Sequence, residues 1–258
     1  MRNWVGGHIM NDDHSKKVVV AILKEIGLEA EEISVQNQKI KTPDIKAWHK
    51  NEQYLIELKI KGDNPQEIEQ EREILRSGEI AEKETPIDSR NRLSAIISAS
   101  VEQFSSHDPN HDAFHVVWLH SSGQSDSLLN MRFRATLFGT QDLFSIERKG
   151  GMTAYYFKES SFFSHRNQLD GAILTYQDKL QLCVNTLSPN YQLFKKSFMH
   201  QALAQGLCDP ESQGMLIADC NFDRKDKNKV LDYLRSKYCL THLQIIDMKH
   251  YSAKCPVR

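Results

Sequence analysis

The stretch KTPDIKAWHKNEQYLIELKIK, residues 41–61, decides the fold. It contains two strand-like runs, DIKAWHK at 44–50 and QYLIELKIK at 53–61, on either side of a polar turn near Asn51-Glu52. Apolar and β-branched residues that flank a short polar break are typical of a β-hairpin. Pro43 lacks an amide hydrogen and suits the start of the first strand. The sequence therefore predicts an antiparallel pair of strands in this stretch.

Two charged residues interrupt the otherwise apolar second strand. Because side chains alternate along a strand, Tyr54, Ile56 and Leu58 share one face, whereas Glu57 and Lys59 share the other. A buried carboxylate or ammonium group is costly unless it has a partner. We therefore expect the neighbouring strand to supply one.

The register of the hairpin identifies the partner. A turn at Asn51-Glu52 pairs Lys50 with Gln53, which places Asp44 opposite Lys59. The same register places Lys46 opposite Glu57, and it leaves Asp44 diagonal to Glu57 on one face. Any loop with an even number of residues keeps these side chains on that face, whereas a bulge would separate them.

Two carboxylates and an amine at one point have a clear chemical use. Asp44 and Glu57 offer hard oxygen ligands for Mg²⁺ or Mn²⁺, and Mg²⁺ needs only one or two carboxylates besides water and substrate phosphate. A bound metal ion lowers the pKa of its water and offsets charge on a scissile phosphate. Lys59 can orient that water or stabilise the developing charge. The pattern therefore points to hydrolysis of a phosphodiester.

These residues carry a resemblance to a known superfamily. Pro43-Asp44, a twelve-residue gap and then Glu57-Leu58-Lys59 is similar to the motif of the PD-(D/E)XK nucleases, which have the restriction-endonuclease-like fold. The resemblance covers roughly residues 12–120 and includes the flanking helices. It implies that Asp44 and Glu57 bind the divalent metal ion and that Lys59 is catalytic.

The resemblance also implies contributions from helices. Many members add an acidic metal ligand from the first helix, and Asp13 is the best-placed candidate here, ahead of Asp12 and Glu25. Some members place a glutamine on a later helix, where this chain has Gln103 in SVEQF. Asp13 thus joins Asp44 and Glu57 as an expected metal ligand.

The surrounding pattern predicts an α/β fold: a restriction-endonuclease-like mixed β-sheet flanked by helices, with a C-terminal α/β extension. Apolar periodicity predicts helices at 15–26 and 90–104, and the hairpin is expected at the centre of the sheet. Further elements are expected as a short strand at 28–35, strands at 114–120, 153–158, 172–176 and 180–185, helices at 126–138 and 191–207, and a strand, helix, strand unit at 214–219, 227–238 and 243–249.

The domain organisation follows from composition. Residues 62–88 hold nine acidic against three basic residues, which predicts a mobile charged insertion with one helix near 67–76. We assign 1–186 to a nuclease-like core that contains this insertion and 187–258 to the C-terminal extension. That extension is expected to lengthen the sheet and help bind substrate.

Composition excludes several classes of protein. The chain has 258 residues, 40% of them hydrophobic, which is enough for a packed core and argues against global disorder. The longest apolar run, 18–23, is too short to cross a bilayer. The net charge of −1 favours no polyanionic partner by itself. Five cysteines without a CxxC pair are typical of reduced thiols in a cytoplasmic protein rather than a zinc knuckle or a disulfide framework.

Other candidate residues are weighed against simpler interpretations. His107, His111 and His115 are spaced by four, but Pro109 interrupts any helix, so we interpret the spacing as accidental. Arg90 and Arg92, at the start of a helix, could hold phosphate or pair with the acidic insertion. Lys46, beside Trp48 in the hairpin, could contact a nucleic-acid backbone or be an ordinary exposed residue.

The sequence therefore predicts a Mg²⁺- or Mn²⁺-dependent nuclease that acts on DNA, in restriction, defence or repair, as an endonuclease. Double-strand cleavage in this class commonly uses two active sites, so a homodimer is compatible, as is a protein partner in such a system. One alternative keeps the fold without the chemistry, as a nucleic-acid-binding or assembly module whose charged cluster is structural. Another is an RNase of the same fold.

Overall fold

A computed structural model describes residues 12–34, 41–87, 91–247 and 249–256. The main sheet that it contains within these residues has seven strands, which run in the order β1, β2, β3, β5, β8, β9 and β10. Their bounds are β1 Glu29–Glu32, β2 Ile45–His49, β3 Glu52–Lys61, β5 Phe114–Ser121, β8 Gly171–Tyr176, β9 Lys179–Val184 and β10 Leu207–Cys208.

The main sheet is mixed. The pairs β1–β2, β2–β3 and β8–β9 are antiparallel, whereas β3–β5, β5–β8 and β9–β10 are parallel. The prediction of a mixed α/β sheet is thus confirmed, and the strands expected at 172–176 and 180–185 are present as β8 and β9. The position expected for the first hairpin is wrong, because β5 is the central strand and β2 and β3 lie towards one edge.

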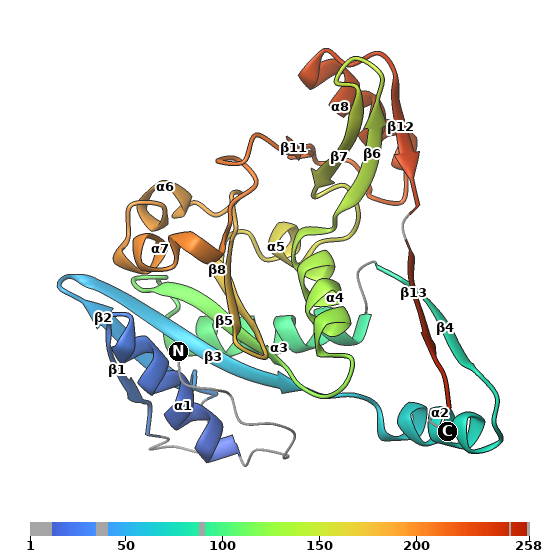
Figure 1. The fold of residues 1–258 in the computed structure, drawn as a ribbon. Coiled ribbons are helices and arrows are strands. Elements are labelled where there is room, and N and C mark those ends of the chain that lie inside the picture. Colours follow the sequence, from blue (N-terminus) through green and yellow to red (C-terminus); the bar gives the residue numbers. More distant parts are fainter. Residues whose placement is uncertain (1–11, 35–40, 88–90, 248, 257–258) are drawn as a thin grey trace.

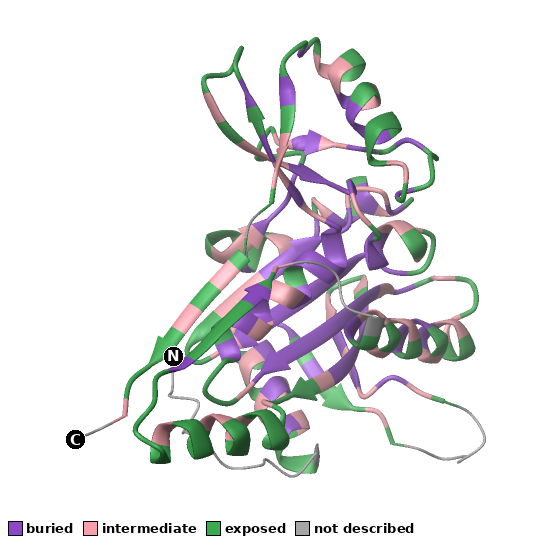
Figure 2. Cartoon of the chain, turned by 90° about the vertical axis from the view of Figure 1, so that its right-hand side faces the viewer, coloured by how far each residue is buried: buried purple, intermediate pink, exposed green. Residues whose placement is uncertain are grey.

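Helices cover both faces of this sheet (Figures 1 and 2). One face packs against α1 (Asp12–Glu25), α6 (Tyr191–Phe194) and α7 (Phe198–Ala202). The other packs against α3 (Asn91–His107), α4 (Asp126–Phe138) and α5 (Ser161–Ser164). The buried strand β5 serves both cores, because Val116 and Trp118 face the α1 side and Val117 and Leu119 face the α3 side.

The first hairpin forms with a register two residues away from the predicted one. His49 pairs with Glu52 and Ile45 pairs with Ile56, so the turn consists of Lys50 and Asn51. Lys50 adopts a left-handed φ of 53°, which a tight hairpin turn requires. Lysine has no preference for this conformation, so the sequence does not indicate it. The shift is an even number of residues, so every side chain keeps its predicted face.

A second sheet lies beside the first (Figure 1, top). Its order is β11, β7, β6 and β12, with bounds β6 Gln141–Ser145, β7 Gly150–Tyr155, β11 Leu216–Ile217 and β12 Leu243–Ile246. It packs with α8 (Lys227–Tyr238) around a separate apolar core. This sheet takes strands from both sides of residue 186, whereas β10 from the C-terminal third joins the main sheet. The strand β6 was not predicted.

The described part of the charged stretch, 62–87, forms an arm with a helix and a strand rather than a single helix (Figure 1, lower right). The predicted helix is present as α2 (Pro65–Arg76), capped by the Asn64 side chain. A strand that was not predicted, β4 (Ala81–Pro86), follows it and pairs antiparallel with β13 (Lys249–Lys254) near the end of the chain. A partner so far away in sequence leaves no local signal.

The single helix predicted over 191–207 is wrong. The segment divides into α6, α7 and a short 3₁₀ helix, η1 (Ala204–Gly206). At the break, the amide of Phe198 donates to the Glu52 carboxylate at 2.8 Å, and the amide of Met199 donates to the Tyr54 hydroxyl at 3.2 Å. Side chains of β3 therefore cap a new helix where local periodicity would have continued the old one.

Candidate active site

Asp44 lies immediately before β2 and is fixed on both carboxylate oxygens. The backbone amide of Leu58 donates to Oδ2 at 2.9 Å, so the carboxylate extends the ladder between β2 and β3 beyond the end of β2. The ammonium group of Lys16, from α1, lies 2.8 Å from Oδ1. Asp44 is thereby held against β3 by the Leu58 amide, and its other oxygen is paired with Lys16.

Glu57 lies within β3 and is almost fully buried, with its side chain 1% exposed. Its Oε1 lies 2.5 Å from the Lys59 ammonium group, whose side chain is 31% exposed. Its Oε2 is buried and has no hydrogen-bond partner within the described part of the chain. A buried carboxylate oxygen without a partner is costly, and such an atom in a folded protein needs an explanation.

The hairpin register brings Asp44 and Glu57 together. Ile45 pairs with Ile56, so Asp44 and Glu57 occupy the next pair of opposite positions along the hairpin. The predicted register had instead placed Asp44 opposite Lys59. Lys46 is paired with Leu55 rather than with Glu57. Asp44, Glu57 and Lys59, the predicted triad, are thus adjacent. The register that brings them together differs from the expected one.

The electrostatics follow from this crowding. Burial, and then the negative charge of Asp44, raises the pKa of Glu57 to about 7, although the hydrogen bond and charge of Lys59 act in the opposite direction. When two carboxyl groups lie close together in a partly buried site, one of them keeps its proton to a higher pH than an isolated carboxyl group does. A divalent cation between them would remove that repulsion and displace the proton.

The raised pKa makes the stability of the metal-free protein dependent on pH. The folded protein keeps a proton on Glu57 that the unfolded chain, with an ordinary glutamate pKa of about 4.3, has lost, so stability falls as pH rises from about 4.5 to about 7. We expect the free energy of unfolding, measured with urea in the presence of EDTA, to drop by on the order of 2 kcal/mol across this window because of Glu57.

Substitution isolates this contribution from that of other titrating groups. Glu57→Gln should abolish the drop, and Glu29→Gln, at an exposed position on β1, should retain it. The same pH dependence in Glu57→Gln as in the wild type would show that this carboxyl group titrates normally.

The donor set fits a small divalent cation in part. Oε2 of Glu57 is a buried acceptor without a partner, and Oδ1 of Asp44 is held by a cation that a metal ion could replace. Mg²⁺ is commonly bound by one or two carboxylates, with water and substrate phosphate completing its octahedron. Within the described ranges, no group of three or more His, Cys, Asp or Glu side chains is arranged to hold a metal ion. Among the described side chains of these four types, Asp44 and Glu57 are therefore the candidate ligands at the hairpin.

The remaining predicted residues lie elsewhere. Asp13 is exposed near the start of α1, and no contact joins it to Asp44 or Glu57 in the described structure. Lys46 is half-buried in β2, and Arg92 is exposed at the start of α3. Arg90 lies outside the described residues.

Sequence reasoning missed Lys16, which takes the place expected for an acidic residue of the first helix. It lies in α1 three residues after Asp13, and it reaches Asp44. The only sequence signal was a lysine about one helical turn from the acidic residues that we considered. Which of these side chains reaches the hairpin depends on how α1 packs, and the sequence does not specify this.

The loop that leads into Asp44 is tied to α3. The Gln103 side chain donates to the carbonyl of Thr42 at 3.3 Å, and Lys41 pairs with Glu102 at 3.0 Å. The glutamine singled out in the sequence therefore positions the strand start rather than the carboxylates. An open pocket of about 780 Å³ adjoins this loop on α3, and its lining includes Ser98 and His165, which share a 2.9 Å hydrogen bond. Neither Asp44 nor Glu57 lines that pocket.

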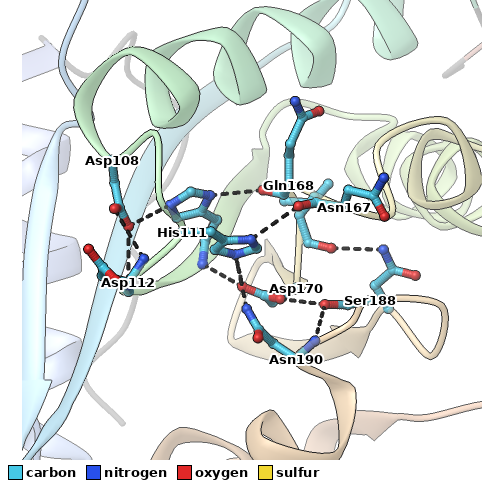
Figure 3. Close-up of polar contacts among 12 residues, drawn as sticks. Asp108, His111, Asp112, Asn167, Gln168, Asp170, Ser188 and Asn190 are labelled. Atoms are coloured by element: carbon cyan, nitrogen blue, oxygen red, sulfur yellow. Dashed lines mark hydrogen bonds and ion pairs between the residues drawn. The ribbon is translucent and has the colours of Figure 1, made fainter.

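A second buried polar cluster lies at the start of β5 and β8 (Figure 3). The rings of His111 and His115 stack with centroids 4.1 Å apart, so their spacing in the sequence does bring them together, although not as metal ligands. His111 adopts a left-handed φ of 59°, which breaks the helical spacing. Asp170, fully buried, accepts from His111 Nε2 at 2.6 Å, from the His115 amide at 2.9 Å and from the Ser188 hydroxyl at 2.5 Å.

The pKa values of the stacked histidines are shifted in opposite directions. Both ring nitrogens of His111 face acceptors, Asp170 and the carbonyl of Asn167. Burial lowers the pKa of His111, but the hydrogen bond and charge of Asp170 together with the Asn167 carbonyl outweigh it, so the pKa is raised. Burial and then the charge of His111 lower the pKa of His115. This cluster ties three chain segments together, at 111–115, 167–170 and 188.

No protein-family model matches this chain, and no curated protein or solved structure matches it. The resemblance to the PD-(D/E)XK nucleases therefore rests on the motif residues, and the restriction-endonuclease-like form of the α/β fold stays a prediction.

Proposed function

We propose that this chain is a divalent-metal-dependent nuclease that hydrolyses phosphodiester bonds, with DNA as its preferred substrate. The observation that carries the proposal is the meeting of Asp44, Glu57 and Lys59, with one oxygen of Glu57 buried and unpartnered. A buried carboxylate oxygen beside a second carboxylate is a suitable ligand for a divalent cation.

Each residue has a separate role in this proposal. Oδ1 of Asp44 and Oε2 of Glu57 would hold Mg²⁺ or Mn²⁺, and the Leu58 amide keeps the Asp44 carboxylate oriented through Oδ2. Bound in this way, the metal ion would lower the pKa of a water molecule and offset charge on the phosphate. Lys59 is half-exposed and held by Glu57 Oε1, so its ammonium group can hydrogen-bond the attacking water or the phosphate oxygens.

Substrate contacts would come from the basic side chains that the sequence singled out. Lys46 shares a face of the hairpin with Glu57, and Arg92 is exposed at the start of α3. Cations of this kind position a nucleic-acid backbone without reading sequence. Cleavage of both strands would use two copies of the site, so a homodimer, or a partner protein in a defence or repair system, belongs to this proposal. No helix within the described residues is long and apolar enough to cross a membrane.

A second candidate function is supported by the charge balance of the site. Two carboxylates meet two ammonium groups, Lys16 on Asp44 and Lys59 on Glu57, so the cluster is neutral without any metal ion. A neutral cluster of this kind could simply hold α1 against the hairpin. In that case the chain is a nucleic-acid-binding or assembly module without catalytic activity.

Digestion with purified protein separates these candidates. Plasmid DNA, single-stranded DNA and RNA are incubated in parallel with the wild type and Mg²⁺, Mn²⁺ or EDTA, alongside the double variant Asp44→Asn/Glu57→Gln purified identically. We expect metal-dependent cleavage of DNA by the wild type alone. Cleavage of RNA alone would identify an RNase. Equal cleavage by the double variant would indicate contamination and remove the nuclease proposal.

A further inference from the structure

The contact between Lys16 and Asp44 bears on how a metal ion could enter the site. Of the two Asp44 oxygens, Oδ2 accepts a hydrogen bond from the Leu58 amide, which belongs to the buried strand β3 and cannot move away. Oδ1 is the oxygen that a metal ion could take, and the Lys16 ammonium group lies 2.8 Å from it. A divalent cation and this ammonium group therefore compete for one oxygen atom.

The surroundings of Lys16 allow it to leave. Its side chain is 21% exposed, so the ammonium group has access to solvent at one end of a flexible stem. Lys16 takes part in a further interaction, so Asp44 is not its only partner.

We propose that Lys16 is a built-in cation that occupies Asp44 Oδ1 in the metal-free protein and sets the affinity of the site for divalent metal ions. This inference rests on the proposed function. In the metal-free state Lys16 neutralises Asp44 beside the buried Glu57, and on metal binding its ammonium group withdraws from Oδ1. The withdrawn ammonium group stays at the mouth of the site, where it can contact a phosphate of the substrate.

The consequence for metal affinity has a definite sign. Removing the charge of Lys16 ends the competition for Oδ1 and removes repulsion between an ammonium group and a divalent ion a few ångströms apart. Because a partly exposed ion pair is worth up to about 1 kcal/mol, we expect the dissociation constant for Mn²⁺ to fall by up to about fivefold in Lys16→Gln. Lys16→Met, which keeps the apolar stem, should give the same direction.

The experiment is a Mn²⁺ titration of the full chain, followed by the electron paramagnetic resonance signal of the free ion. It compares the wild type with Lys16→Gln, Lys16→Met and Lys17→Gln. Lys17 is the exposed neighbour on α1, so its substitution changes the net charge equally without touching Asp44. Thermal unfolding with and without Mn²⁺ shows that each variant is folded, and the increase in Tm on adding Mn²⁺ should be larger in the Lys16 variants than in the wild type.

The outcomes separate this inference from the proposed function. Tighter Mn²⁺ binding by both Lys16 variants, with Lys17→Gln unchanged, supports the inference. Wild-type binding with equal or weaker binding by folded Lys16 variants overturns it and leaves the metal site standing. Absence of Mn²⁺ binding in every protein overturns both, because the carboxylates then hold no metal ion at all.

Discussion

Replacing Lys59 with alanine is expected to slow phosphodiester cleavage by about a hundredfold to a thousandfold, the usual cost of removing one group that stabilises charge in a transition state. The Lys59 ammonium group lies beside Glu57 Oε1 and is the exposed member of the buried pair, so it faces the substrate side. Single-turnover cleavage of plasmid with saturating Mn²⁺ measures the chemical step and keeps metal affinity from limiting the rate.

The matched control is Lys61→Ala. Lys61 is exposed on the same face of β3, two residues beyond Lys59, and its removal changes the charge of the protein by the same amount. We expect Lys61→Ala to cleave within a few-fold of the wild type. Similar rates for Lys59→Ala and the wild type would show that this lysine only pairs with Glu57. That result is expected if the cluster has a structural role and no catalytic one.

The largest expected effect on stability belongs to Asp170. Its fully buried carboxylate accepts hydrogen bonds from His111, the His115 amide and Ser188, and it raises the pKa of His111. Asp170→Ala leaves these three donors without their acceptor. Because each buried donor left without an acceptor costs about 1–3 kcal/mol, we expect a loss on the order of 3–5 kcal/mol of the free energy of unfolding, which urea denaturation measures directly.

Asp178→Ala serves as the control for Asp170→Ala. Asp178 is exposed in the turn between β8 and β9, close in sequence but outside the cluster, so its loss should change the free energy of unfolding by less than about 0.5 kcal/mol. A cost below about 1 kcal/mol for Asp170→Ala would mean that the cluster of Figure 3 does not hold its three segments together.

The sequence was most informative where local periodicity determines structure. Alternation along 53–61 placed Glu57 and Lys59 on one face, and the even-length turn kept Asp44 on that face even though Lys50 shifted the register by two residues. The helices 15–26 and 126–138 were likewise visible as apolar periodicity and caps, and both are present.

The sequence was least informative where distant segments decide the outcome. The pairing of β4 with β13 joins residues more than 150 positions apart, and the break between α6 and α7 depends on Glu52 and Tyr54 of β3. The contact of Lys16 with Asp44 depends on the packing of α1 against the hairpin. Such contacts follow from the assembled fold, so no pattern within either segment could have predicted them.

The central claim is that Asp44 and Glu57 bind one divalent cation. A crystal of the wild-type protein soaked in Mn²⁺ at a pH above 7, where Glu57 is ionised, tests it through the anomalous difference density of the metal ion. We expect one peak about 2.1 Å from Asp44 Oδ1 and from Glu57 Oε2, with the Lys16 ammonium group displaced. No peak between the two carboxylates, with Lys16 and Lys59 still paired to them, would contradict the account.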